Sequence, residues 1–201
     1  MRAILVHGLG RTPLSMLLLA ARLRSRGIQP GLFGYSATFE TLKGCAERLR
    51  RFIDRKAGQA RYVVVGHSLG TVLLRTVYPH LRVPPAACFF IAPPAQACRA
   101  ARACAPLAIF RLAAGEMGQL LANPAFMDSL PVPQCATRIY AGTAGPVGRW
   151  SPFGQEANDG ILSLKEAMIP GIPVTTVKRF HTFAMNASVI ADDIADVGNA
   201  P

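Results

Sequence analysis

Ser68 lies between two glycines, in the pentapeptide GHSLG at 66–70. The run before it, YVVV, is apolar and rich in β-branched residues, and the run after it, TVLLRTVY, has the apolar spacing of a helix. Because glycine permits sharp turns and positive φ angles, Gly66 and Gly70 predict a strained turn with Ser68 at its tip. A strand, a tight serine turn and a helix are the setting of a nucleophilic serine, the G-x-S-x-G elbow.

A nucleophilic serine needs a neighbouring base, because its hydroxyl reacts poorly at neutral pH. In a parallel sheet such groups collect where strands end at their carboxyl ends. His181 follows the predicted strand VTTVKRF at that end and is the predicted base, with His7, which closes the first strand, as the alternative. His67 adjoins Ser68, so we expect its side chain to point away and pack, whereas His80 ends a helix at the wrong end of the sheet.

The base in turn needs a carboxylate that orients it. Asp159 stands in an Asn-Asp-Gly turn after the strand TRIYAG, and such a turn is stiffened by its own side-chain hydrogen bonds. Glu156 is the main competing acid and Asp128 a weaker one. The remaining carboxylates downstream of His181 are expected to face solvent on the last helix: Asp192, Asp193 and Asp196.

Alternating strands and helices would position these residues. The alternation predicts an α/β fold, a minimal and mostly parallel sheet of about six strands with helices on both faces. We expect strands at about 3–6, 28–35, 62–65, 86–91, 137–141 and 173–178, and helices at about 12–26, 41–56, 69–80 and 182–196.

Residues 95–130 interrupt this alternation. They are rich in alanine, show no strand pattern, and predict two helices at about 95–114 and 115–122. We expect a small helical insertion within a single domain, 1–201. Two interpretations stay open: a cap over the mouth of the site, with Arg99 and Arg102 at its rim, or helices packed on the sheet edge with their arginines in water.

The composition limits the classes of protein. Hydrophobic residues make up 51% and charged residues 16% of 201 residues, which is typical of a globular chain. The net charge of +11 comes mainly from scattered arginines, since only four of the 22 basic residues are lysines. These arginines indicate solvated helix faces or attraction to anionic lipid headgroups, and no nucleic-acid-binding module accompanies them.

The cysteines and the N-terminus indicate a compartment. No pair forms C-x-x-C or a spacing suited to metal, so we expect neither a metal nor a cofactor, and an odd count favours reduced thiols. MRAILVHG enters a short apolar strand directly, without the pattern of a signal peptide, and no run is long enough to span a membrane. We therefore expect a cytoplasmic protein with five free thiols: Cys45, Cys88, Cys98, Cys104 and Cys135.

Four segments in order along the chain carry a resemblance: ILVHGLGR at 4–11, VVVGHSLGTVL at 63–73, NDGILSLKEAMIPG at 158–171 and HTFAMN at 181–186. The order Ser68, Asp159, His181 is that of α/β-hydrolases. The chain resembles the α/β-hydrolase superfamily, and within it the compact bacterial lipase/esterase-like serine hydrolases. It lacks the two leading antiparallel strands of many members, and its insertion is smaller than their lid domains.

The resemblance implies cleavage of a carboxylic ester, lipid-like or otherwise, through an acyl-enzyme on Ser68. It also implies an oxyanion hole made by the backbone N–H groups of Leu69 and of Leu9, which follows the His7-Gly8 pair. Their leucine side chains would then line an acyl-binding surface. An acyltransferase or thioesterase with the same triad remains an alternative, as does a non-catalytic binding protein of this fold.

Overall fold

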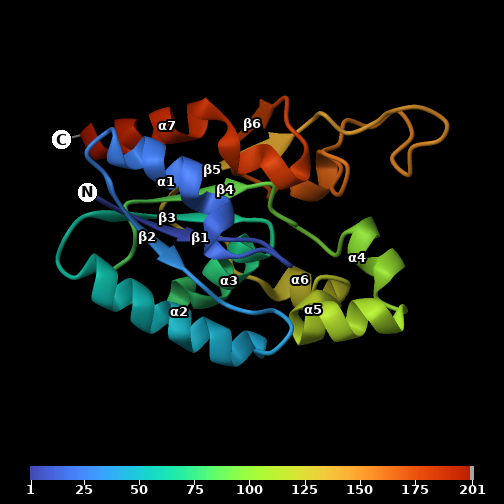
Figure 1. The fold of residues 1–201 in the computed structure, drawn as a ribbon, viewed down its shortest axis with the longest axis horizontal. Coiled ribbons are helices and arrows are strands. Elements are labelled where there is room, and N and C mark those ends of the chain that lie inside the picture. The colour runs from blue at the N-terminus through green and yellow to red at the C-terminus, as the bar shows by residue number, and fades with distance from the viewer. Residues whose placement is uncertain (200–201) are drawn as a thin grey trace.

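A computed structural model of the chain describes residues 1–199, in which six strands form one parallel sheet (Figure 1). The strand order is β2-β1-β3-β4-β5-β6, and every neighbouring pair is parallel. The predicted α/β fold with a parallel sheet of about six strands is confirmed. The strands are β1 (Arg2–Val6), β2 (Gln29–Phe33), β3 (Tyr62–His67), β4 (Ala87–Ile91), β5 (Ala136–Gly142) and β6 (Val174–Val177).

The central strands are buried on both faces, which explains their continuous apolar sequences. In β1, Ala3 and Leu5 join the hydrophobic cluster on one face of the sheet, while Ile4 and Val6 join the cluster on the other. Helices α2 (Leu42–Ala57) and α3 (Leu69–Val77) cover the face of Ile4 and Val6. The opposite face is covered by η1 (Pro13–Met16), α1 (Leu17–Arg24) and α7 (Ser188–Asn199).

Helix α2 shows how local sequence sets an element. The Thr41 side chain caps it by accepting from the Gly44 N–H at 3.2 Å, and it ends where Gly58 takes φ 55°. Its buried residues recur every three or four positions, so one stripe faces the sheet. The bounds lie within one residue of the predicted 41–56.

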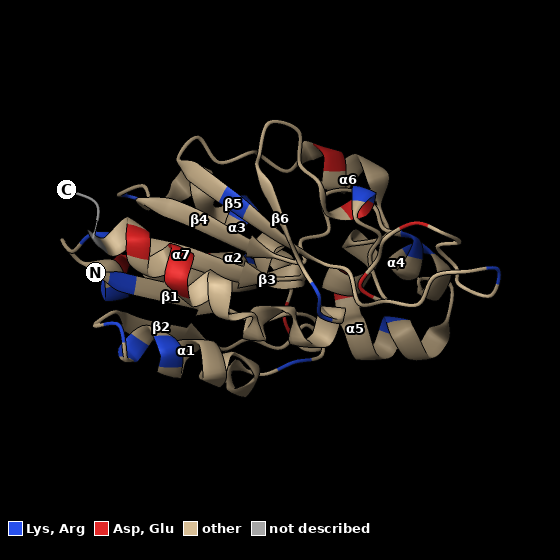
Figure 2. Cartoon of the chain, turned by 90° about the horizontal axis from the view of Figure 1, so that it is seen from above, with Lys and Arg blue, Asp and Glu red and all other residues tan. Residues whose placement is uncertain are grey.

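The insertion contains α4 (Arg99–Cys104), α5 (Ala108–Leu120) and α6 (Pro124–Ser129), and it lies beyond the carboxyl end of the sheet (Figure 2). The prediction of one helix over 95–114 is wrong. The first helix ends before Pro106, which has no N–H to donate to a continuing helix. The break predicted at 115 coincides with a kink in α5. Gly115 takes φ 56° there, and a Cβ would lie 2.3 Å from the Ala37 carbonyl oxygen.

The remaining short helices are η2 (Tyr78–His80), η3 (Lys165–Ala167) and η4 (His181–Asn186). Of these, η3 lies in the segment between β5 and β6, and η4 directly follows β6 and begins with His181. Within residues 1–199, no helix has the length and hydrophobicity needed to cross a bilayer.

Candidate active site

Ser68 occupies a strained turn between β3 and α3. Its φ of 51° and ψ of −121° are rare for a residue with a Cβ. The turn is held to the neighbouring strand by the Ser68 N–H, which donates to the Ile91 carbonyl at 2.9 Å. The hydroxyl therefore stands at the carboxyl end of the central strand, as the sequence predicts.

The flanking glycines serve close approach rather than positive φ. A Cβ on Gly66 would lie 2.8 Å from the Thr71 nitrogen, and one on Gly70 would lie 2.4 Å from the Val6 carbonyl oxygen. The strained turn with Ser68 at its tip is as predicted; its positive φ belongs to Ser68, and neither glycine has one. Gly8 likewise allows a close approach to Ser68, since a Cβ on Gly8 would lie 3.1 Å from the Ser68 Cβ.

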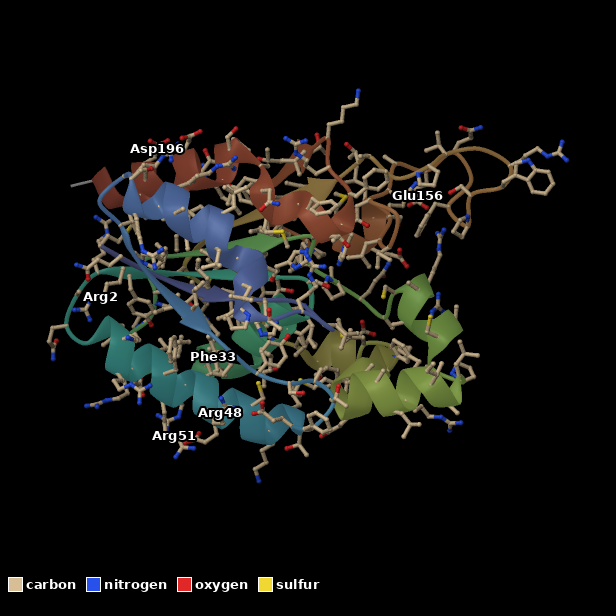
Figure 3. The ribbon with its side chains drawn as sticks, viewed as in Figure 1. Arg2, Phe33, Arg48, Arg51, Glu156 and Asp196 are labelled. Carbon is tan, nitrogen blue, oxygen red and sulfur yellow. The ribbon has the colours of Figure 1, made fainter. Side chains whose placement is uncertain are left out.

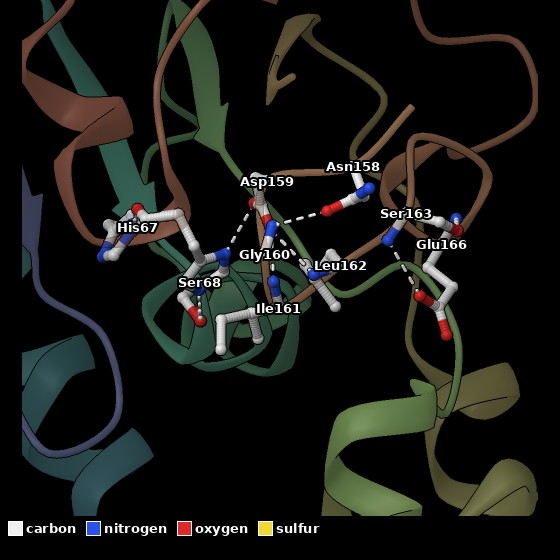
Figure 4. A network of polar contacts seen from close by, with 10 residues as sticks. His67, Ser68, Asn158, Asp159, Gly160, Ile161, Leu162, Ser163 and Glu166 are labelled. Carbon is white, nitrogen blue, oxygen red and sulfur yellow. Dashed lines mark hydrogen bonds and ion pairs between the residues drawn. The ribbon is translucent and has the colours of Figure 1, made fainter. Parts of the chain in front are cut away.

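Asp159, His181 and Ser68 form a hydrogen-bonded row (Figure 4). His181 Nδ1 lies 2.7 Å from Asp159 Oδ2, and because a carboxylate accepts, Nδ1 donates. In the neutral ring of that tautomer, Nε2 is an acceptor, and the Ser68 hydroxyl lies 2.9 Å from it. The three predicted residues thus meet, in the arrangement that a serine nucleophile, a base and an orienting acid require.

The Asp159 carboxylate is fixed by its own turn. Its Oδ1 accepts from the Ile161 N–H at 2.9 Å and the Leu162 N–H at 2.7 Å, which leaves Oδ2 for His181 (Figure 4). The Asn158 amide stiffens the same loop by accepting from the Gly160 N–H at 2.9 Å. The side chain of Asp159 is 2% exposed, so water competes little for these bonds.

His67 contacts the backbone of His181, the predicted base. It is fully buried, and its Nε2 donates to the His181 carbonyl at 2.9 Å, since a carbonyl only accepts. Burial lowers the pKa of His67 to about 3, with smaller contributions from His181 and Arg11, so the ring is neutral. Sequence analysis predicted only packing for His67 and missed this hydrogen bond. Its partner lies 114 residues away in the sequence, and no local pattern indicates the contact.

The alternatives for the base and the acid have other partners. His7 donates from Nδ1 to the Gly8 carbonyl at 3.0 Å and stacks on Tyr35, and burial lowers its pKa. Glu156 pairs with Arg99 at 3.1 Å. Figure 3 places Glu156 and Asp196 toward opposite ends of the molecule. The other carboxylates are on helices: Asp128 on α6, and Asp192 and Asp193 on α7, where they bind Arg26 and Tyr140.

The two backbone N–H groups predicted to form an oxyanion hole belong to Leu69, which directly follows Ser68, and to Leu9, which follows Gly8. Leu69 is the first residue of α3, where the helix supplies no acceptor, and Leu9 follows Gly8 in the turn after β1. Among residues 1–199, no backbone carbonyl accepts from either group. The Leu69 side chain is 1% exposed in the core beneath α3, which differs from the expectation that it lines an acyl surface, and Leu9 packs partly buried on the same cluster.

Sequence comparison identifies the family. The chain belongs to the alpha/beta hydrolase family, whose pattern it matches over residues 3–194. A search of curated proteins finds no match. The fold is therefore that of a member of this family.

Solved structures show the same fold at low sequence identity. Phospholipase PlaB from Legionella pneumophila is similar with a TM-score of 0.75 and 11% identity, over 100% of this chain and 59% of that one. The metagenomic carboxyl esterase MGS0156 is similar with a TM-score of 0.73 and 17% identity, over 98% of this chain and 74% of that one. The RedJ thioesterase from Streptomyces coelicolor is similar with a TM-score of 0.65 and 16% identity, over 98% of this chain and 85% of that one. At these identities the similarity establishes the fold alone.

Proposed function

We propose that the chain is a serine hydrolase that cleaves carboxylic esters through an acyl-enzyme on Ser68. The observation that carries this proposal is the row from Asp159 through His181 to Ser68, with heavy-atom distances of 2.7 and 2.9 Å. Both distances lie within hydrogen-bonding reach, and the tautomer that Asp159 imposes leaves His181 Nε2 free to accept a proton.

The reaction follows from these positions. Ser68 Oγ attacks the ester carbonyl carbon while His181 Nε2 takes the hydroxyl proton, and the Asp159 carboxylate stabilises the resulting imidazolium. The negative oxygen of the tetrahedral intermediate would be bound by the N–H groups of Leu9 and Leu69, each such donor contributing about 2.7–4 kcal/mol. His181 then protonates the departing alcohol, accepts a proton from water as the water attacks the acyl-enzyme, and returns it to Ser68.

The proposal is tested by replacing the nucleophile. We expect Ser68→Ala to lower the hydrolysis of p-nitrophenyl esters by at least about 10³-fold, because loss of a triad member removes a step that the other groups cannot replace. Ser129→Ala, at an exposed serine on α6, is the matched control and should hydrolyse as the unmodified chain does. Activity of Ser68→Ala within about tenfold of the unmodified chain would reveal another nucleophile.

The substrate class is decided by the same assay with other acyl donors. Rates on acyl-CoA thioesters, and on esters with an added alcohol acceptor, compare ester hydrolysis with thioester hydrolysis and acyl transfer. Preference for an ester with water as acceptor is the expected result. No turnover of any acyl donor would instead favour a non-catalytic binding protein of this fold.

A further inference from the structure

Large apolar side chains protrude into water at the carboxyl end of the sheet. The five most exposed among residues 1–199 are Phe39 at 88%, Trp150 at 86%, Ile109 and Leu112 at 76%, and Leu14 at 70%. Each belongs to a segment that follows the carboxyl end of a strand. Such a concentration of exposed apolar surface on one end marks an interaction surface.

Two of these segments project farthest beyond the sheet. They are the beginning of the α4–α5 insertion, 99–113, and the loop 143–155 after β5, which lie at the same end of the molecule in two perpendicular views (Figures 1 and 2). We call these two segments together the docking end. The first turns of α5 pack only weakly on the body, since Ile109 and Leu112 lie one turn apart and both face water.

The docking end carries only positive charge. Its two segments contain Arg99, Arg102, Arg111 and Arg149 and no acidic residue. Arg99 pairs with Glu156, whereas the salt bridges within residues 1–199 include none of the other three. The Arg149 guanidinium lies 4.6 Å from the ring centroid of Trp150, so a cation and an aromatic ring share the tip of the loop.

We infer that the docking end binds an anionic phospholipid bilayer, with its apolar side chains among the headgroups and its arginines on lipid phosphates. Trp side chains favour the bilayer interface, and long arginine side chains reach phosphates while their stems stay in apolar surroundings. The inference rests on the proposed function in one respect: docking turns the Ser68 end of the sheet toward the bilayer, which makes membrane lipid the ester substrate.

Trp150 gives a direct test, because it is the only tryptophan of the chain. The Ser68→Ala variant, which would leave the lipid intact, is titrated with vesicles of phosphatidylcholine alone or mixed with phosphatidylglycerol. We expect Trp150 emission to shift to the blue with the mixed vesicles and far less with phosphatidylcholine. Added salt should reverse the shift, since charges are screened over about 8–10 Å at physiological ionic strength.

Co-sedimentation with the same vesicles tests the arginines. The double variant Arg102→Glu/Arg149→Glu should bind at least about 25-fold more weakly, because each basic residue near an anionic surface contributes about fivefold, or about 1 kcal/mol. The matched control is Arg24→Glu/Arg82→Glu, two exposed arginines near the amino ends of strands, which has the same net charge. Equal binding by the two double variants would overturn the inference.

The apolar contribution is tested separately. Ile109→Ser/Leu112→Ser should weaken binding to mixed vesicles, while Val83→Ser/Val132→Ser, at the opposite end of the sheet, should not. A blue shift that depends on protein concentration without lipid would indicate self-association and contradict membrane docking.

The two proposals fail separately. Vesicle binding by a chain that hydrolyses no acyl donor would overturn the proposed function alone. Hydrolysis of soluble esters without vesicle binding would overturn docking alone.

Discussion

His181 is fixed through both its side chain and its backbone. Asp159 Oδ2 holds the ring at Nδ1, and the Asp159 carbonyl accepts from the His181 N–H at 2.9 Å. His67 completes the arrangement by donating to the His181 carbonyl from the residue next to Ser68. His181 is therefore bound both to the loop of Asp159 and to the turn of Ser68, and these bonds set the distance between its Nε2 and the serine hydroxyl.

Replacing His67 tests whether this bond positions the base. We expect His67→Phe, which cannot donate, to lower kcat for p-nitrophenyl ester hydrolysis by about tenfold or more with a smaller change in KM, because small misplacements of reacting groups are costly. His67→Gln keeps an N–H donor of similar reach and should recover most of the rate. Equal kcat values for the two variants would assign His67 to packing alone.

Sequence reasoning worked best where a residue's position depends on the strand that precedes it. Ser68, Asp159 and His181 each follow a strand, and parallel strands bring their carboxyl ends together, so their meeting was predictable. The helix bounds in the insertion were not predictable in this way. Pro106 interrupts an alanine-rich run, and Gly115 kinks α5 where it meets the Ala37 carbonyl. The contact between Gly115 and Ala37 joins segments far apart in the sequence, and the local composition does not indicate it.

At the scale of elements, Glu166 connects the loop of Asp159 to the insertion. Its two carboxylate oxygens accept from the Arg99 N–H at 2.7 Å, at the start of α4, and from the Ser163 N–H at 2.9 Å. The side chain is 3% exposed, so both bonds are shielded from water. The Glu166 side chain thus joins the start of α4 to the loop that follows Asp159.

We expect Glu166→Gln to destabilise the protein by about 1–3 kcal/mol, because the amide offers one acceptor where two buried N–H groups need one each. Urea unfolding measures the change. Lys165→Gln, at the exposed neighbour, is the control and should leave the midpoint unaltered. A Glu166→Gln midpoint equal to that of the control would show that the two bonds contribute nothing to stability.

At the scale of the whole molecule, folding lowers the pKa of two buried histidines in a strongly basic chain. Burial lowers the pKa of both His7 and His67 below the ordinary value of 6.5, for His67 to about 3. The unfolded chain therefore binds more protons than the folded one as the pH falls below 6.5. The free energy of unfolding is therefore unaffected by these two rings above pH 6.5, and it falls progressively as the pH drops from 6.5 toward 3.

The free energy of unfolding should accordingly fall between pH 7 and pH 5. His67 alone contributes a loss of about 2 kcal/mol at pH 5, since one pH unit below the unfolded pKa corresponds to about 1.4 kcal/mol. His67→Gln should flatten this dependence, whereas His80→Gln, at an exposed position, should keep it. Urea unfolding at the two pH values measures the slope, and equal slopes for His67→Gln and the unmodified chain would contradict the assignment.

The central claim is that Ser68 is a nucleophile activated by His181. Labelling with a fluorophosphonate, followed by mass mapping of peptides, tests it without knowledge of the substrate. We predict an adduct on Ser68 that forms at least about 10³-fold more slowly in His181→Ala and at the normal rate in His80→Ala. Absence of an adduct on Ser68, or equal labelling of His181→Ala and the unmodified chain, would contradict the account.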